Sequence, residues 1–187
     1  MPLSPAAPRA PIHTRTIVCQ GYRREDGLWD IEGRLVDTKS YAYKNEWRGF
    51  IEPGDPVHEM LVRLTLDDKL TVVAIECATE NSPFALCPDI LPKYQQLVGE
   101  RIGAGWTRRI RSLAGGAEGC IHQSELLSVL ATVALQTIGP VLAREKNNPD
   151  GMPRFVIDSC HVWRGDGDMV RRHFPDHKPG ESKQKAG

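Results

Sequence analysis

The stretch from Gly115 to Val141, GGAEGCIHQSELLSVLATVALQTIGPV, decides the fold of this chain. It begins with closely spaced glycines, places Cys120 and His122 at the expected start of a helix, and continues as a long, mostly apolar run. Leucine, valine, alanine and isoleucine recur in that run at helical spacing and form a broad apolar stripe. We therefore predict one long helix, residues 121–144, that buries its stripe against the rest of the chain.

The chain before this helix has strand chemistry. Residues 14–22 and 28–36 flank an Asp26-Gly27 pair, whose glycine supplies the positive φ that a tight hairpin turn needs. Residues 57–66 and 70–78 form a second pair of runs, and the first of these alternates apolar and polar side chains clearly. Strands that precede helices predict an α+β fold: an antiparallel sheet of two or more hairpins, packed against a long C-terminal helix and shorter helices.

Four further segments complete this prediction. Residues 37–56 carry four aromatic side chains without a clean period, which predicts a long loop or an irregular strand. From about Asp89 the apolar spacing predicts a helix, and residues 107–113, TRRIRSL, predict a short basic helix. Residues 154–170, in which Cys160 and His161 are adjacent, are interpreted as one more strand.

Length and composition bound the class of protein. The chain has 187 residues, and its 24 basic and 24 acidic residues give no net charge. No global field therefore attracts nucleic acid or an anionic membrane. We expect one domain over residues 14–174, between a flexible arm, residues 1–13, and a disordered tail, residues 175–187.

Three observations predict a cytoplasmic protein. The first residues lack the apolar core of a signal peptide. The long apolar run contains polar residues and a Gly-Pro pair, which favours a core helix over a membrane span. The five cysteines are widely spaced, so we expect them to be reduced.

Cys120 and His122 are the first candidates for chemistry. A helix N-terminus lowers the pKa of a thiol and favours a bound anion. Glu125 follows His122 by three residues, where its carboxylate can orient the imidazole or bind a metal beside it. The alternative is structural: a buried cysteine beside a hydrogen-bonded histidine.

A metal site needs nitrogen, sulfur or oxygen ligands that converge. His58 and Cys87 come from the end of a predicted strand or from the loop after it, so His58, Cys87, Cys120 and His122 would supply the ligands that zinc or iron takes. The sequence has no Cys-x-x-Cys pair. This disfavours a closed structural zinc site and leaves two alternatives, an open site for one zinc or iron ion and no metal at all.

Without a metal, the same residues suit acid–base catalysis. His122 or His58 would be the base, Glu125 or Glu76 would orient it, and Arg109 would hold a substrate anion. For the basic helix the alternative is a solvated face. The candidate substrate-binding residues are Trp29, Asp30, Tyr43 and Arg108.

Several enzyme classes are disfavoured because their motifs are missing. There is no G-x-S-x-G for a serine nucleophile. The glycines of GGAEGC are not followed by the Lys-Ser/Thr of a phosphate-binding loop. Chemistry with ATP or NAD is therefore disfavoured, and a lyase or hydrolase without a nucleotide cofactor is favoured over a redox enzyme.

The chain contains, in this order, the segments CQGYRREDGLWDIEGRLVDTK, DPVHEMLVRLTLDD, CATENSPFALCP, LVGERIGAGWTRRIR, GGAEGCIHQSELL and DSCHVWRGDGDMVRRHFP. Together they resemble the bacterial family known as domain of unknown function 2889, over residues 2–175. The resemblance implies a small cytoplasmic bacterial protein from species that degrade aromatic compounds. It implies no accepted reaction.

A fainter similarity is to the iron–sulfur scaffold proteins of the NifU type, which also run as a strand meander followed by helices. In DPVHEM, His58 and Glu59 stand where that family has its first ligands, and Cys87 stands near the second. Cys120-Ile121-His122 resembles the third in reversed and spaced form. The Cys-Gly-Asp of that family is missing here, so the resemblance implies one metal ion rather than a cluster.

Our leading hypothesis is a small enzyme, a lyase or hydrolase. It would act on a small aromatic catabolite of the lignin-derived type, in a Cys/His pocket at the start of the helix over residues 121–144. One zinc or iron ion is the cofactor it could hold. The alternatives are a non-catalytic metal or iron–sulfur carrier and a ligand-binding accessory protein. The expected partner is the small-molecule substrate, with no nucleic acid and no membrane, and a homo-oligomer is left open.

Overall fold

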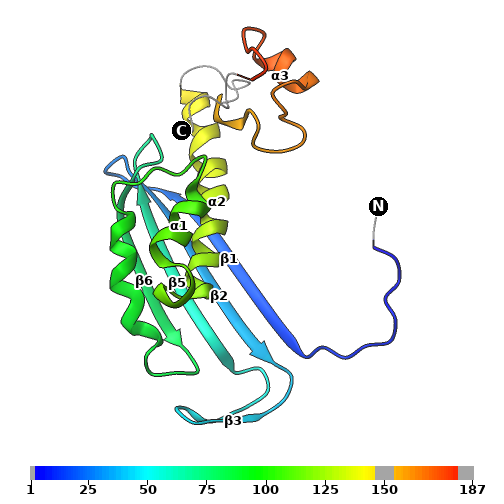
Figure 1. Cartoon of the computed structure of the whole chain (residues 1–187), viewed down its shortest axis with the longest axis vertical. Coiled ribbons are helices and arrows are strands. Elements are labelled where there is room, and N and C mark those ends of the chain that lie inside the picture. The colour runs from blue at the N-terminus through cyan, green and yellow to red at the C-terminus, as the bar shows by residue number, and fades with distance from the viewer. Residues whose placement is uncertain (1–2, 146–153, 181–187) are drawn as a thin grey trace.

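Four long strands form one antiparallel sheet in this computed structural model, which describes residues 3–145 and 154–180. Along the sheet the order is β1-β2-β5-β6, so neighbours in the sheet are also neighbours among the long strands of the sequence (Figure 1). The strands are β1 (His13–Arg23), β2 (Trp29–Lys39), β5 (Pro56–Leu66) and β6 (Val72–Asn81). Both predicted hairpins are confirmed, and the β2–β5 pairing joins them.

The helices follow the sheet in the sequence, so the predicted α+β class is confirmed. The helical elements are η1 (Cys87–Leu97), α1 (Trp106–Ala114), η2 (Gly116–Glu118), α2 (Ile121–Glu145), η3 (Arg154–Val156) and α3 (Asp168–His173). The predicted long helix and the short basic helix correspond to α2 and α1. The helix expected from about Asp89 is the 3₁₀ segment η1, in which Pro92 has no N–H to offer an α-helical ladder.

Two predicted segments differ from the structure. The loop over residues 37–56 contains the end of β2 and a small hairpin of β3 (Tyr43–Asn45) and β4 (Gly49–Ile51). The strand expected over residues 154–170 is wrong, because this segment holds η3, a series of turns and the start of α3. Gly165 and Gly167 lie in those turns, and their lack of side chains disfavours a strand.

The structure describes most of the predicted N-terminal arm and the first part of the predicted C-terminal tail. Residues 3–12 are exposed and form no helix or strand, and β1 begins at His13. The last part of the predicted tail, residues 181–187, lies outside the described residues, as do residues 1–2 and 146–153.

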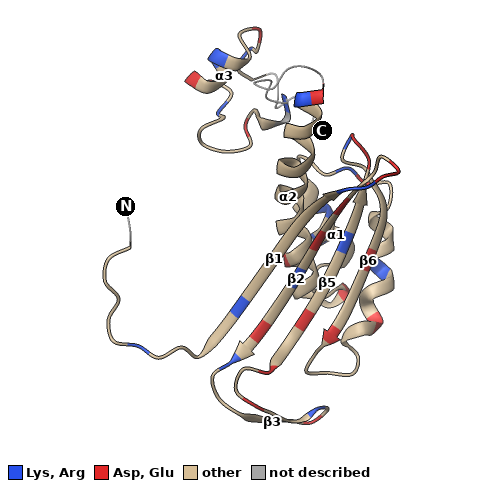
Figure 2. Cartoon of the chain, turned by 180° about the vertical axis from the view of Figure 1, so that it is seen from behind, with Lys and Arg blue, Asp and Glu red and all other residues tan. Residues whose placement is uncertain are grey.

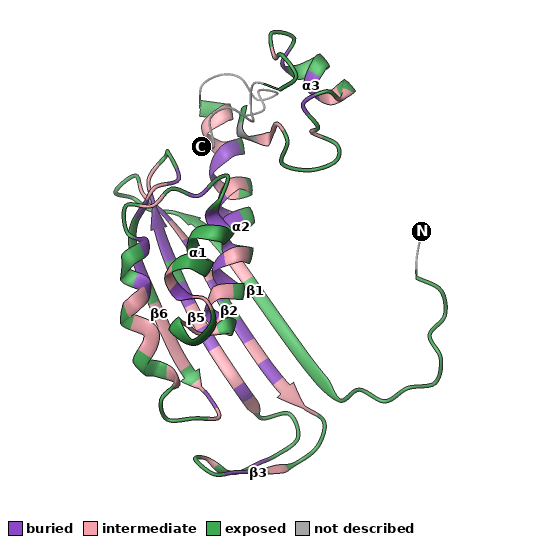
Figure 3. Ribbon diagram, viewed as in Figure 1, coloured by how far each residue is buried: buried purple, intermediate pink, exposed green. Residues whose placement is uncertain are grey.

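The core lies between the sheet and one layer of helices. Helices α1 and α2, together with η1, cover one face of the sheet (Figure 1). Alternate side chains of β2 and β5 are buried beneath them, and Figure 3 shows this alternation along both strands. Fully buried residues of α2 meet them from above: Leu126, Leu127, Leu130 and Ala134. The alternate apolar side chains of the strands and the apolar stripe of α2 therefore pack together in one core.

Helix α2 is long and apolar enough to cross a membrane by length and composition alone. Leu126, Leu127 and Leu130 are fully buried in the core that α2 shares with the sheet, as in the core helix of an α+β protein. The opposite face of the sheet carries no helix among the described residues (Figure 2), and the ion pairs of Arg63 with Glu32 and Glu76 lie on it. The sheet is thus apolar on one face and polar on the other.

Two glycines allow α2 to lie close to the sheet. A Cβ atom built on Gly21 of β1 would lie 2.1 Å from Thr137 Oγ1 and 2.8 Å from Thr137 Cβ. A Cβ atom on Gly33 of β2 would lie 2.8 Å from Leu126 Cδ1. Real Cβ atoms do not approach other heavy atoms so closely, so any side chain at these positions pushes the helix or its side chains away.

We predict that Gly21→Ala destabilises the protein by about 1–3 kcal/mol, the usual cost of overpacking. The clash involves the Cβ atom of Thr137, which cannot rotate away. Urea unfolding measures the change. Gly103→Ala is the matched control, because nothing lies within 4 Å of a Cβ atom there. Equal stability of the Gly21 variant and the wild type would show that α2 sits further from β1.

Candidate metal centre

A row of three polar residues crosses the sheet beneath the start of α2. The register places Arg15 of β1 opposite Asp37 of β2, and Asp37 opposite His58 of β5. The Asp26-Gly27 turn fixes the first of these pairings, because Arg23 lies opposite Trp29 at its base and the ladder continues without a shift. Turn chemistry near one end of the hairpin therefore determines which side chains meet at the other end.

Asp37 stands on the core face of β2. Trp29, Ile31 and Leu35 are buried on that face, and continuing the same period of two reaches Asp37, which is 1% exposed. A carboxylate in such a place requires partners, because burying an unpaired charge is costly. Every partner found here carries, or can carry, a positive charge.

Arg15 and three of the chain's six histidines surround this carboxylate. Arg15 donates two hydrogen bonds to it, from Nε to Oδ1 at 2.7 Å and from its terminal nitrogen to Oδ2 at 2.8 Å. His13 Nε2 lies 3.3 Å from Oδ1. His58 Nδ1 lies 3.1 Å from Oδ2, and His122 Nε2 lies 3.5 Å from the same oxygen.

The start of α2 brings His122 over this row. The Cys120 N–H donates to the Tyr94 hydroxyl oxygen at 3.0 Å, and Tyr94 in turn donates to the Cys120 carbonyl at 3.0 Å. Tyr94 of η1 is buried, so these contacts fix the residue that precedes the helix. The ring of His122 then lies 3.9 Å from the ring of His58, centroid to centroid, with 30° between their planes.

Burial controls the charge of the two rings. Desolvation and then the charge of His122 lower the pKa of His58, Asp37 opposes them, and the resulting pKa is about 4. Desolvation, and then the charge of Arg15, lower the pKa of His122. Both imidazoles are therefore neutral at pH 7, which is the form that binds metals.

Asp37 remains ionised in the same environment. Burial alone would raise its pKa, but the hydrogen bonds and charge of Arg15, together with His58 and His122, bring the pKa below its usual value. Arg15 also forms an ion pair with Glu125 of α2. Two carboxylates, Asp37 and Glu125, thus share the one guanidinium of Arg15 beside two neutral imidazoles, an arrangement that favours a cation.

The ligand atoms have the spacing of a metal site. Two atoms bound to zinc at about 2.0–2.1 Å and at a tetrahedral angle lie roughly 3.3 Å apart. Asp37 Oδ2 lies 3.1 Å from His58 Nδ1 and 3.5 Å from His122 Nε2. One ligand atom from each of the three residues lies within 4.8 Å of the other two.

Cys120 supports His122 from its other side. Its sulfur lies 3.8 Å from His122 Nδ1, within hydrogen-bonding range for sulfur. Histidines that bind metals usually hold the second ring nitrogen in this way, which fixes the tautomer and the orientation of the ring. In this structure Cys120 therefore lies beside His122 and outside the group of three residues that could hold a metal ion.

The other candidate residues from the sequence are spread over the molecule. Glu125 lies beside the centre through its ion pair with Arg15. Cys87 begins η1 and Tyr43 begins β3, and neither is among the three ligand residues. Arg109 forms an ion pair with Glu100. Arg108 is exposed on the same helix, α1.

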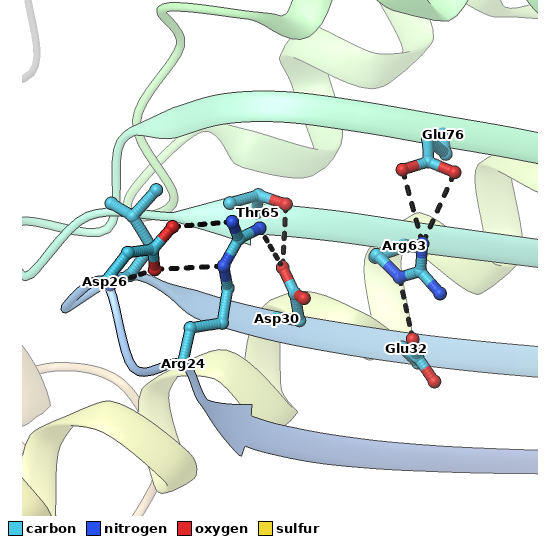
Figure 4. Close-up of polar contacts among 8 residues, drawn as sticks. Arg24, Asp26, Asp30, Glu32, Arg63, Thr65 and Glu76 are labelled. Atoms are coloured by element: carbon cyan, nitrogen blue, oxygen red, sulfur yellow. Dashed lines mark hydrogen bonds and ion pairs between the residues drawn. The ribbon is translucent and has the colours of Figure 1, made fainter.

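Trp29 and Asp30 lie at the far end of β2 from Asp37, about 26 Å away for eight residues of strand. Trp29 is buried, and its indole N–H donates to Asp68 at 2.9 Å. Asp30 lies on the polar face of the sheet, where it accepts a hydrogen bond from Thr65 and contacts Arg24 (Figure 4). The structure therefore brings together His58 and His122, with Cys120 and Glu125 adjacent.

Asp37, Arg15 and His13 were missed from the sequence, although a signal for them existed. The alternation that places Trp29, Ile31 and Leu35 on the core face also places Asp37 there, which predicts a buried carboxylate. Extending the hairpin register from the Asp-Gly turn then finds Arg15 opposite it.

Comparisons with known proteins agree with part of this picture. A family model described as a protein of unknown function (DUF2889) matches residues 13–136. This range begins at His13 and includes all the residues that surround Asp37. No curated protein and no solved structure matches the chain, and the resemblance to NifU-type scaffold proteins has no support from these comparisons.

The thiols should differ in reactivity. Burial, and then the charge of Cys120, raise the pKa of Cys77 to about 12, and burial raises the pKa of Cys19. At pH 8 both are therefore protonated and react slowly with iodoacetamide, whereas exposed Cys160 reacts first. Mass spectrometry of peptides after timed alkylation measures the order. Modification of Cys77 as fast as Cys160 would contradict the burial of its thiol.

Proposed function

The chain belongs to the family of proteins of unknown function DUF2889, and from the geometry of Asp37, His58 and His122 we propose that it binds one zinc or iron ion at these residues. The observation that carries the proposal is the spacing of the ligand atoms. Asp37 Oδ2 lies 3.1 and 3.5 Å from one nitrogen of each histidine. Zinc and non-haem iron are the metals that a set of two histidines and one carboxylate suits best.

We infer further that the metal has a catalytic role. Three protein ligands leave at least one coordination position for water or substrate, as in catalytic zinc sites. Both imidazoles are partly exposed, so this position can be reached from solvent. A metal at such a site supplies an acidic bound water and a Lewis acid, which suits the lyase or hydrolase expected from the sequence.

A small aromatic substrate is proposed on the basis of the segment beside the centre. The β3–β4 hairpin leaves the sheet two residues after Asp37 and returns two residues before His58. Its base is held by Gly54, whose N–H donates to the Lys39 carbonyl at 2.9 Å. Trp47 and Phe50 of this hairpin are 65% and 66% exposed. Exposed aromatic side chains on a segment that flanks a site favour an aromatic ligand.

Metal content tests the first part of the proposal. We expect close to one zinc or iron per chain in protein purified without a histidine tag, by inductively coupled plasma mass spectrometry. Asp37→Asn and His122→Ala should each abolish metal binding, because only two of the three proposed ligands would remain in either variant. Saturating zinc should raise the melting temperature of the wild type, since about 2.7 kcal/mol is gained at one hundred times the Kd.

Two matched variants make this test specific. His161→Ala removes an exposed histidine from the C-terminal segment and should leave the metal content unchanged. Cys87→Ser tests the cysteine ligand expected from the sequence, and full metal content in this variant would remove Cys87 from the site. Metal-free wild type that also fails to take up zinc or iron would overturn the metal proposal.

Turnover tests the catalytic part. Metal-loaded protein should convert at least one member of a panel of lignin-derived phenolic esters and ethers, as followed by liquid chromatography. Asp37→Asn, treated with the same metal, should lose this activity. Full metal content without turnover of any member would contradict the enzymatic role and favour a metal carrier.

A further inference from the structure

The two edges of the sheet differ in whether another described segment hydrogen-bonds to them. At the β6 edge, the segment around η1 pairs with the strand: Gly99 N–H donates to the Val72 carbonyl at 2.8 Å, and Val72 N–H donates to the Glu100 carbonyl at 2.9 Å. Gln95 adds a side-chain hydrogen bond to the Ile75 carbonyl at 2.8 Å. At the other edge lies β1, and no described strand or helix pairs with its outer side.

The outer edge of β1 is long and regular. The strand has 11 residues, roughly 36 Å, with no proline and no shift of register against β2. All of its residues except Cys19 are exposed, and Figure 3 shows β1 exposed along its length. Proteins usually protect such an edge by shortening, bulging or charging it, because its free backbone groups pair readily with another strand.

The hydrogen bonds at the two ends of the hairpin show which backbone groups are free. Ser40 N–H donates to the Ile12 carbonyl, and Arg24 N–H donates to the Leu28 carbonyl. Hydrogen-bonded pairs alternate along an antiparallel ladder, so the even-numbered residues of β1 bond to β2. The odd-numbered residues direct their N–H and C=O groups outward. These are His13, Arg15, Ile17, Cys19, Gly21 and Arg23.

The charges of β1 are already paired within the chain. Arg15 binds Asp37 and Glu125, and Arg23 forms an ion pair with Glu145. On the polar face of the sheet β1 presents neutral side chains with high strand propensity, among them Val18, which is 50% exposed. The edge is therefore free of the unpaired charge that would repel an identical strand.

We propose that a second copy of this chain pairs with β1, antiparallel, to form a dimer with one continuous sheet. The two-fold axis lies at Val18. In this register the whole strand overlaps, Val18 faces its own copy, Ile17 faces Cys19 and Arg15 faces Gly21. No two arginines then stand opposite one another, whereas a shift that centres the axis on Cys19 would oppose Arg15 and Arg23. An isologous two-fold contact of this kind is the commonest way to form a dimer.

Light scattering coupled to size exclusion tests the dimer on the full chain. The expected mass is twice the 20.8 kDa of one chain. Ile17→Pro removes an outward N–H and leaves the β1–β2 ladder intact, so this variant should keep its circular dichroism spectrum and fall to the mass of one chain. Val18→Pro is the matched variant, since it removes an N–H that bonds β2 and should destabilise the fold. A wild type with the mass of one chain at every concentration would overturn the proposal.

Cross-linking tests the register independently of any proline. In a Cys160→Ser background, which removes the exposed native thiol, Val18→Cys should form a disulfide-linked dimer on mild oxidation. Thr16→Cys is the control, because residue 16 faces residue 20 of the second copy and lies about 13 Å from its own counterpart. Cross-linking of the Thr16 variant but not of the Val18 variant would overturn this arrangement, as would a dimer mass that survives Ile17→Pro.

Discussion

The buried carboxylate of Asp37 is the constraint on which this structure depends. Removing a carboxylate from water costs several kcal/mol, even after the protein has relaxed around it. The bidentate contact with Arg15 offsets that cost, and the contacts with His13, His58 and His122 offset it further. These partners come from two strands and a helix, so a single negative charge on β2 specifies how β1, β2, β5 and α2 must be placed. Two of the residues that contact the buried carboxylate, His58 and His122, also complete the group that could hold a metal ion.

The layer of helices makes that arrangement possible. One helix layer covers one face of the sheet, and the glycines at positions 21 and 33 bring α2 close enough for the ring of His122 to reach the row of strand residues. Tyr94 holds the residue before the helix by two hydrogen bonds. The polar side chains of the opposite face pair among themselves and take no part in the centre, as the contacts of Arg63 with Glu32 and Glu76 show (Figure 4).

Local patterns in the sequence predicted most of the fold. The Asp26-Gly27 turn and the alternation over residues 57–66 gave both hairpins, and the apolar stripe gave α2 within one residue of its C-terminal end. Two of the three residues that could hold a metal ion, His58 and His122, were also among the candidates from the sequence. Asp37 was not predicted because no motif marks a carboxylate on a strand. Cys87 was predicted because it follows a strand, but its position in space depends on η1, whose path no periodicity describes. The strand predicted over residues 154–170 was wrong because the hydrophobic residues of this segment suit a short turn-rich unit as well as a strand.

The ion pairs between β1 and α2 also bear on how the chain folds. Arg15 and Glu125 are 110 residues apart in the sequence, and Arg23 and Glu145 are 122 apart. The strand that is synthesised first therefore acquires its helical partner last, and the entropy of closing so large a loop must be overcome before these contacts form. During synthesis β1 and β2 can pair as a hairpin while Asp37 still lacks the imidazole of His122. Completion of the centre thus coincides with arrival of α2, and an intact centre marks a chain that has finished folding.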